Sequence, residues 1–229
     1  FVAIGRHADH DLGSIDILVN NAAIFTVKPF EEIEEPEWDR VFAVNVKGVL
    51  FGCQAVSPFM RKRKAGRIIN LSSQAGKTGG LLIGAHYSAS KAAVMCMTKS
   101  FAAALASDNV TVNAIAPGVI NTDFLKGVPG IENLYPRIPL GKKPGEASDV
   151  AKAVAFLASA DAGYITGEIL DVVSIAPATQ AVALACDPTS GTLYTLGRDA
   201  HIAAFNKATM ADGALLSLWP AIDADPSFV

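Results

Sequence analysis

The chain has 229 residues, of which 51% are hydrophobic and 18% charged, so it can bury a sizeable core and is not disordered overall. The net charge is −3 and the longest basic run spans residues 61–64, which indicates neither a nucleic-acid partner nor a membrane surface. Three distant cysteines fit neither a disulfide framework nor a metal site and predict a reducing, cytoplasmic location. We find neither a leader nor an apolar stretch of about 18 residues, and expect no signal peptide and no transmembrane helix.

Short β-branched apolar runs alternate with longer helical patterns over most of the chain. Helical signals include Pro36 with acidic neighbours at one start and a basic cluster before Gly66 at that helix's end. The predicted elements are, in order, a strand at 15–19, a helix at 36–63, a strand at 67–71, a helix at 88–107, a strand at 110–115, a helix at 147–159 and a strand at 168–172. This alternation predicts an α/β fold, a Rossmann-like doubly wound parallel sheet with right-handed crossovers.

Polar or Gly/Pro-rich residues follow three successive predicted strands, at 20–23, 72–74 and 117–122. In open parallel sheets, ligands bind outside the carboxyl ends of the strands. The sequence therefore predicts that these three segments meet at one rim of the sheet and form a ligand site.

Tyr87 and Lys91 are four residues apart at the start of a predicted helix, so they share one helical face. A phenol has an ordinary pKa of about 10, and a neighbouring ammonium stabilises its phenolate; lowering that pKa by about 3 units takes roughly 4 kcal/mol. Taken alone, a tyrosine and a lysine at this spacing usually mark the edge of an amphipathic helix. Ser73 ends the preceding predicted strand, and a Gly-rich loop joins it to Tyr87, so the two hydroxyls can reach one substrate oxygen.

Several motifs occur in one order over about residues 10 to 172, and together they resemble the short-chain dehydrogenase/reductase family. They are Asn20-Asn21-Ala22-Ala23, Asn45-Val46-Lys47-Gly48, Ser73, Tyr87-Ser88-Ala89-Ser90-Lys91, and Pro117-Gly118 followed by Ile120 and Thr122. The resemblance implies an enzyme that binds NAD or NADP; which of the two is not indicated.

The resemblance implies a role for each matching residue. Tyr87 would be the general acid/base, Ser73 would hold the substrate oxygen, and Lys91 would lower the Tyr87 pKa and bind the nicotinamide ribose. Asn45 would anchor a water that relays protons to the lysine, and Gln74 would join Ser73 and Tyr87 in binding substrate. The implied cofactor-binding residues are Asn21, Ala22, Ala23, Tyr87, Lys91, Pro117, Gly118, Ile120 and Thr122. No metal is expected, because the four histidines lack ligand spacing; we interpret His86 as a loop residue beside Tyr87.

The implied activity interconverts a secondary alcohol and a ketone, with a polyol, sugar or 3-oxoacyl substrate. The alternative is a catalytically inactive fragment or pseudoenzyme that acts, if at all, by pairing with other subunits. The resemblance also implies a homo-oligomer, a dimer or tetramer formed through the helices near 37–63 and 88–107.

The sequence departs from the family pattern at both ends. No Gly-rich turn precedes the first strand, which corresponds to the family's fourth, so we expect roughly 60 to 80 residues to be missing upstream. Residues 1–172 form the predicted partial dehydrogenase domain and hold 17 side chains of each charge sign, whereas 173–229 hold two basic and five acidic ones. We interpret 173–229 as an unrelated, β-rich tail with strands at 182–185, 192–196 and 201–205, similar to part of a β-propeller blade.

Overall fold

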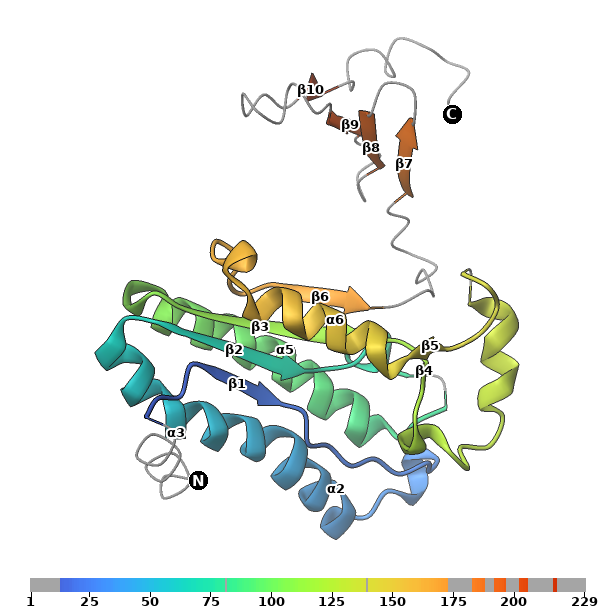
Figure 1. Ribbon diagram of the computed structural model, residues 1–229. Coiled ribbons are helices and arrows are strands. Elements are labelled where there is room, and N and C mark those ends of the chain that lie inside the picture. Colours follow the sequence, from blue (N-terminus) through green and yellow to red (C-terminus); the bar gives the residue numbers. More distant parts are fainter. Residues whose placement is uncertain are drawn as a thin grey trace. The chain divides into compact units, whose positions relative to one another are not determined.

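The computed structural model describes residues 13–80, 82–138 and 140–172, and four later strands at 183–187, 192–196, 202–205 and 216–217 (Figure 1). By its internal contacts the chain divides into two compact units, Phe1–Ile175 and Ala176–Val229. The predicted functional residues all lie in the first unit.

A four-stranded parallel sheet forms the centre of the first unit, in the order β1-β2-β3-β6. Its strands are β1 (Ile17–Asn20), β2 (Gly66–Leu71), β3 (Val110–Pro117) and β6 (Ile169–Val172). β2 and β3 are almost entirely buried because helices cover both faces of the sheet, as their near-continuous apolar character predicted. The predicted parallel α/β sheet is confirmed, with strand ends displaced by one or two residues.

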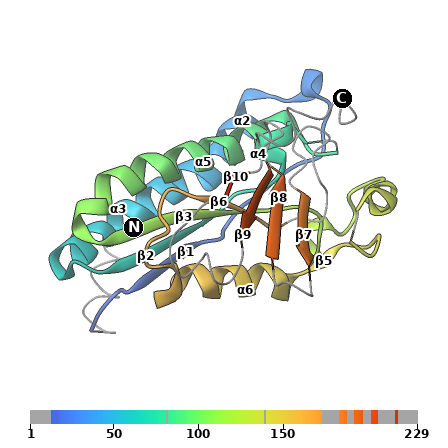
Figure 2. The same cartoon turned by 90° about the horizontal axis from the view of Figure 1, so that it is seen from above.

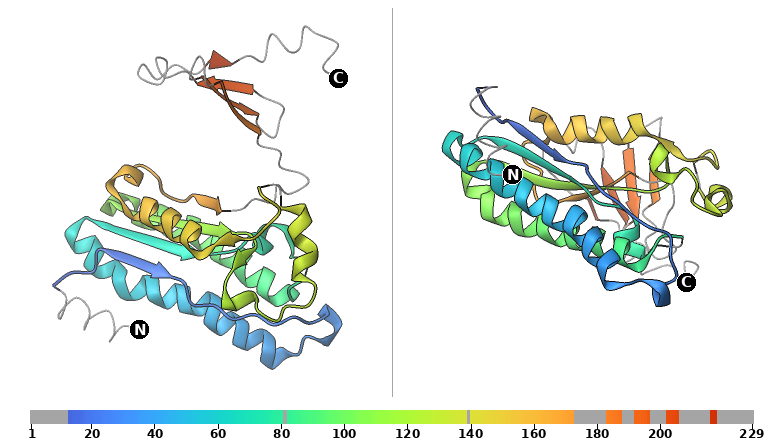
Figure 3. Two further views of the ribbon diagram at one scale, coloured as in Figure 1. Left: turned by 45° about the vertical axis from the view of Figure 1, so that its right-hand side comes forward. Right: turned by 90° about the horizontal axis from the view of Figure 1, so that it is seen from below.

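Helices cover both faces of this sheet. One face carries α2 (Glu35–Phe42), a π-helical turn η2 (Ala43–Lys47), α3 (Gly48–Arg63) and α5 (Ala85–Leu105), and the other carries α6 (Ala147–Ala158) (Figures 2 and 3). The predicted helix at 36–63 is thus one rod with a π-turn inside it. It ends at Lys64, which adopts a left-handed conformation with φ of 54°, and the predicted stop residue Gly66 already belongs to β2.

Two hydrophobic clusters hold the layers together. The first packs α3 and α5 on the sheet around Val49, Met60, Ile68 and Val94; the second packs α6 around Ile69 and Leu157. On α5, Val94 and Leu105 are buried in the first cluster, and Met97 and Phe101 pack against it. Within the described residues, Glu35–Arg63 is long and apolar enough to span a membrane by length and composition. The apolar face of this helix packs on the sheet.

Short elements surround the carboxyl edge of the sheet. They are η1 (Phe30–Glu32), α4 (Ala75–Thr78), the two-residue strands β4 (Ile120–Asn121) and β5 (Gly145–Glu146), η4 (Asp123–Leu125) and η5 (Ile131–Arg137). Two more turns, η3 (Ala106–Asp108) and η6 (Ala160–Ala162), lie at the helix ends that precede β3 and β6. A capping box of Glu146 and Asp149 begins α6 directly after β5. The β4–β5 pair therefore fixes where α6 meets the site.

The second unit contains an antiparallel sheet in the order β10-β9-β8-β7. Its strands are β7 (Ala183–Asp187), β8 (Thr192–Leu196), β9 (Ile202–Phe205) and β10 (Leu216–Ser217). Three of them lie at or within two residues of the predicted strands. The interpretation of 173–229 as an unrelated tail similar to part of a propeller blade stays a prediction.

Candidate active site

The three predicted rim segments line one cavity of about 740 Å³ at the carboxyl edge of the sheet. Its wall contains every residue predicted to contact cofactor, together with Ser73. Asn45 and Gln74, which the sequence also placed in the site, are not part of this wall. The remaining walls come from η4 and from α6, which add Phe124, Leu125, Val150 and Val154.

Tyr87 lies in the first turn of α5 and is only 5% exposed. Its backbone N–H donates to the Gly84 carbonyl at 3.0 Å, and its own carbonyl accepts from the Ser90 hydroxyl at 2.7 Å. Burial raises the pKa of the Tyr87 phenol to about 12, and a hydrogen bond with the Ser73 hydroxyl acts in the opposite direction. Tyr87 is therefore a neutral phenol at neutral pH, with its hydroxyl beside Ser73 as the sequence predicted.

Lys91 lies one turn further along α5 and is also buried. Its ammonium donates to the Leu71 carbonyl at 2.7 Å and lies 5.7 Å from the centre of the Tyr87 ring. Burial lowers the pKa of Lys91 to about 8. The sequence predicted that Lys91 lowers the Tyr87 pKa; in this structure the larger effect is desolvation of the phenol, which has the opposite sign.

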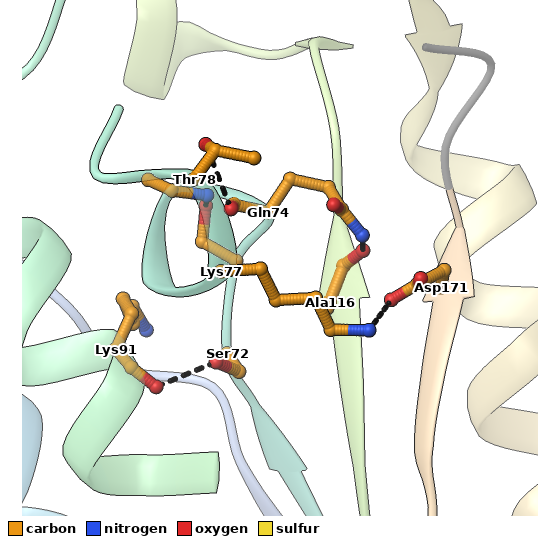
Figure 4. Close-up of polar contacts among 9 residues, drawn as sticks. Ser72, Gln74, Lys77, Thr78, Lys91, Ala116 and Asp171 are labelled. Carbon is orange, nitrogen blue, oxygen red and sulfur yellow. Dashed lines mark hydrogen bonds and ion pairs between the residues drawn. The ribbon is translucent and has the colours of Figure 1, made fainter. Parts of the chain in front are cut away.

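The segment that carries Ser73 is fastened to the neighbouring strands (Figure 4). The Gln74 side-chain amide donates to the Ala116 carbonyl at 3.4 Å and its backbone N–H donates to the Pro117 carbonyl at 2.9 Å. The Lys77 ammonium pairs with Asp171 of β6 at 2.5 Å. Gln74 therefore anchors the turn that holds Ser73, and its predicted contact with substrate stays a prediction.

Asn45 lies in the π-turn η2 and has no exposed surface. Its amide oxygen accepts from the Ile24 N–H, and its amide nitrogen donates to the Ile24 carbonyl, each at 2.9 Å. The same nitrogen donates to the Ser90 hydroxyl at 3.0 Å, which in turn donates to the Tyr87 carbonyl. The side chain of Asn45 thus joins the segment after β1 to the turn of α5 that carries Tyr87. Its predicted role as the anchor of a water stays a prediction.

Sequence reasoning missed an aromatic group beside Tyr87. The ring of Phe25 packs edge-on against Tyr87 with centroids 5.9 Å apart, and against Phe124 at 4.4 Å. Neither phenylalanine lies in a periodic pattern, so only their positions after predicted strands could have signalled them. His86 was also misplaced, because it is a fully buried residue of α5 and not a loop residue.

The donors along the cavity fit the nicotinamide end of a dinucleotide. An ammonium has three N–H donors, and the single bond of Lys91 to Leu71 leaves donors for ribose hydroxyls. Ile120 and Thr122 lie across the cavity, beside Gly118, where backbone and hydroxyl groups can meet a carboxamide. Within the described part of the chain, no group of three or more His, Cys, Asp or Glu side chains could hold a metal ion.

Comparison with known proteins decides the family. A family model described as enoyl-(acyl carrier protein) reductase matches residues 2–173. The chain belongs to the short-chain dehydrogenase/reductase family. Among relatives, it is 43% identical over 170 residues to nodulation protein G of Azospirillum brasilense, covering 71% of this chain and 66% of that protein.

Other family members show the same extent of similarity. The chain is 42% identical over 173 residues to a sorbitol dehydrogenase of Cereibacter sphaeroides, covering 70% of this chain and 67% of the relative. A crystal structure assigned to a short-chain alcohol dehydrogenase from Sinorhizobium meliloti 1021 superposes with a TM-score of 0.70 at 34% identity, covering 76% of this chain and 69% of that one. The chain spans about two thirds of the length of the curated relatives it matches.

Proposed function

We propose that this chain is an NAD(P)-dependent oxidoreductase that interconverts a secondary alcohol and a ketone. The observation that carries the proposal is the meeting of Tyr87, Ser73 and Lys91 in one cavity at the carboxyl edge of the sheet. A nicotinamide bound along Asn21, Ala22, Ala23, Pro117, Gly118, Ile120 and Thr122 would supply or accept the hydride. The protein's own task is then to orient the substrate and to move one proton.

Tyr87 performs the proton transfer in this proposal. Its raised pKa keeps the phenol protonated at neutral pH, so it is ready to donate a proton to a carbonyl oxygen as reduction proceeds. The Ser73 hydroxyl, already hydrogen-bonded with Tyr87, would donate to the same oxygen. Lys91, protonated below its pKa of about 8, supplies positive charge near the phenol as a proton leaves it.

The substrate class follows from the relatives' names and from the cavity. Relatives include a sorbitol dehydrogenase, a galactitol 2-dehydrogenase, an acetoacetyl-CoA reductase and 3-oxoacyl-[acyl-carrier-protein] reductases, each about 40 to 44% identical. We infer that the substrate is a polyol, a sugar or a 3-oxoacyl thioester. Ile83, Phe124 and Leu125 provide apolar surface for its non-reacting part.

A panel assay tests this proposal directly. Reduction of acetoacetyl thioesters is followed by the loss of absorbance of NADH or NADPH, supplied at high concentration. Oxidation of sorbitol or galactitol is followed by the gain in absorbance as NADH or NADPH forms. We expect turnover with at least one class. Absence of turnover with every substrate and both cofactors would overturn the proposal and favour a role through subunit pairing alone.

We also propose that the protein forms a homo-oligomer through α3 and α5. A small hollow of about 100 Å³ lies between these two helices and is lined by Leu50, Gln54, Phe101 and neighbours. Light scattering during size-exclusion chromatography would show a dimer or tetramer. A strictly monomeric protein at micromolar concentration would contradict this.

A further inference from the structure

A row of polar side chains lies beside Tyr87, outside the cavity, and the proposed proton transfer does not use it. The Thr26 hydroxyl is hydrogen-bonded to the carboxylate of Glu37 in α2 and lies 2.7 Å from Nε2 of His86 in α5. Glu37 also pairs with the Lys28 ammonium at 3.0 Å. His86 has no exposed surface. Nε2 of His86 also lies 3.6 Å from the Glu37 carboxylate, so three segments that are distant in sequence meet around the Thr26 hydroxyl.

The chemistry of these groups fixes the direction of the hydrogen bonds. The Thr26 hydrogen bond and the Lys28 ammonium hold the pKa of Glu37 below its ordinary value, so the carboxylate is ionised at neutral pH and can only accept. Thr26 has one proton and gives it to Glu37. Its oxygen must then accept from His86, which requires a proton on Nε2 of the imidazole.

The surroundings of the other ring nitrogen agree with this assignment. Nδ1 of His86 is buried and has no hydrogen-bond partner within the described residues. A neutral ring protonated at Nε2 leaves only a lone pair there, whereas the other tautomer or an imidazolium would bury an N–H without an acceptor. A Cβ atom at Gly84 would lie 2.6 Å from Nδ1, so glycine at this position allows the ring its place.

We propose that Glu37, Thr26 and His86 are positioning residues for Tyr87; this rests on the proposed function. Glu37 and Thr26 keep a proton on Nε2 of His86, and the three side chains together hold the segment before α5 in place. The connection to Tyr87 runs along the backbone. The Gly84 N–H donates to the Thr26 carbonyl at 3.1 Å, and the Gly84 carbonyl accepts from the Tyr87 N–H.

The same contacts place the aromatic neighbour of Tyr87. Phe25 lies between Ile24, which Asn45 holds at both its backbone polar groups, and Thr26, which the row holds through its side chain. With both neighbours fixed, the Phe25 ring stays edge-on against Tyr87. Loss of the Thr26 hydroxyl is therefore expected to loosen Phe25 and the first turn of α5 together.

Nitrogen-15 NMR of histidine-labelled protein tests the tautomer without any need for turnover. The His86 signals are identified by their loss in His86→Gln. We expect correlations of a neutral imidazole protonated at Nε2 at pH 7. A ring protonated at Nδ1, or a doubly protonated ring, would overturn the proposal.

Kinetics test the positioning role with a matched pair of variants. Thr26→Val keeps the shape of the side chain without the hydroxyl, and we expect kcat to fall about tenfold or more while KM changes less than about threefold. Thr26→Ser keeps the hydroxyl and is expected to retain most of the wild-type kcat. Equal kcat values for both variants would overturn the positioning role. A wild-type protein without turnover would instead refute the proposed function. The NMR result would still decide which ring nitrogen of His86 carries the proton.

Discussion

Replacement of Lys91 by methionine is expected to stabilise the protein while it abolishes turnover. Lys91 is buried, and its pKa of about 8 lies below the ordinary 10.5. That difference corresponds to a penalty of about 3 kcal/mol for the charged ammonium in the folded state. Loss of the hydrogen bond to the Leu71 carbonyl costs about 1 kcal/mol. The free energy of unfolding of Lys91→Met should therefore be about 2 kcal/mol higher than that of the wild-type protein at pH 7.

The pH dependence of stability distinguishes this effect of the Lys91 charge from an effect of packing, which does not change with pH. Between pH 8 and 10.5 the unfolded state holds the Lys91 proton more tightly than the folded state, so wild-type stability rises with pH across that window. The advantage of Lys91→Met should therefore shrink between pH 7 and pH 10. Urea denaturation of both proteins at several pH values measures it.

A control on the same helix separates burial from charge. Lys99 of α5 is exposed, and Lys99→Met is expected to change the free energy of unfolding by less than about 0.5 kcal/mol at either pH. A Lys91→Met variant that is less stable than wild type at pH 7, or a difference that does not change up to pH 10, would refute the reasoning.

Three further predictions concern other parts of the site. Asn45→Ala leaves both backbone groups of Ile24 without their partner and should lower the free energy of unfolding by about 2 to 4 kcal/mol in urea denaturation. Asn121→Ala, at an exposed position, should lower it by less than about 0.5 kcal/mol. Equal effects of the two substitutions would contradict the role of Asn45. Alcohol oxidation needs the Tyr87 phenolate, and because burial raises its pKa, the oxidation rate should rise with pH above neutrality while ketone reduction does not; parallel pH profiles would argue against Tyr87 as the acid/base. Lys77→Met breaks the pair with Asp171 that fastens the Ser73 turn, and steady-state kinetics should show a lower kcat; an unchanged kcat would show that Gln74 and the backbone suffice.

The sheet and the pairing of Tyr87 with Lys91 were predictable because their signals are local. Continuous β-branched runs indicate strands covered on both faces, and the four-residue spacing of Tyr87 and Lys91 places them on one helical face. The burial of the helical face that carries Tyr87 and Lys91 could not be predicted from the sequence. Desolvation decides the pKa shifts of both residues, and it depends on the walls that η4, α6 and the segment after β1 build around them.

The contacts of Asn45 and Gln74 were not predictable for a different reason. The partner of Asn45 is the backbone of Ile24, 21 residues away, and the contact is made from a π-turn that no sequence pattern announced. Gln74 turns to the Ala116 carbonyl on the adjacent strand, a choice that depends on sheet order. The hydrogen-bond partners of both residues arise from tertiary packing.

A paired measurement on wild-type protein and Tyr87→Phe tests whether Tyr87 is the proton donor of a nicotinamide-dependent oxidoreductase. NADH- or NADPH-dependent reduction of an acetoacetyl thioester, and oxidation of sorbitol or galactitol, are measured for the wild-type protein and for Tyr87→Phe, with cofactor binding followed by calorimetry. We expect turnover to fall by about a thousandfold or more in Tyr87→Phe, while the cofactor dissociation constant changes little. Wild-type rates in Tyr87→Phe would contradict this assignment.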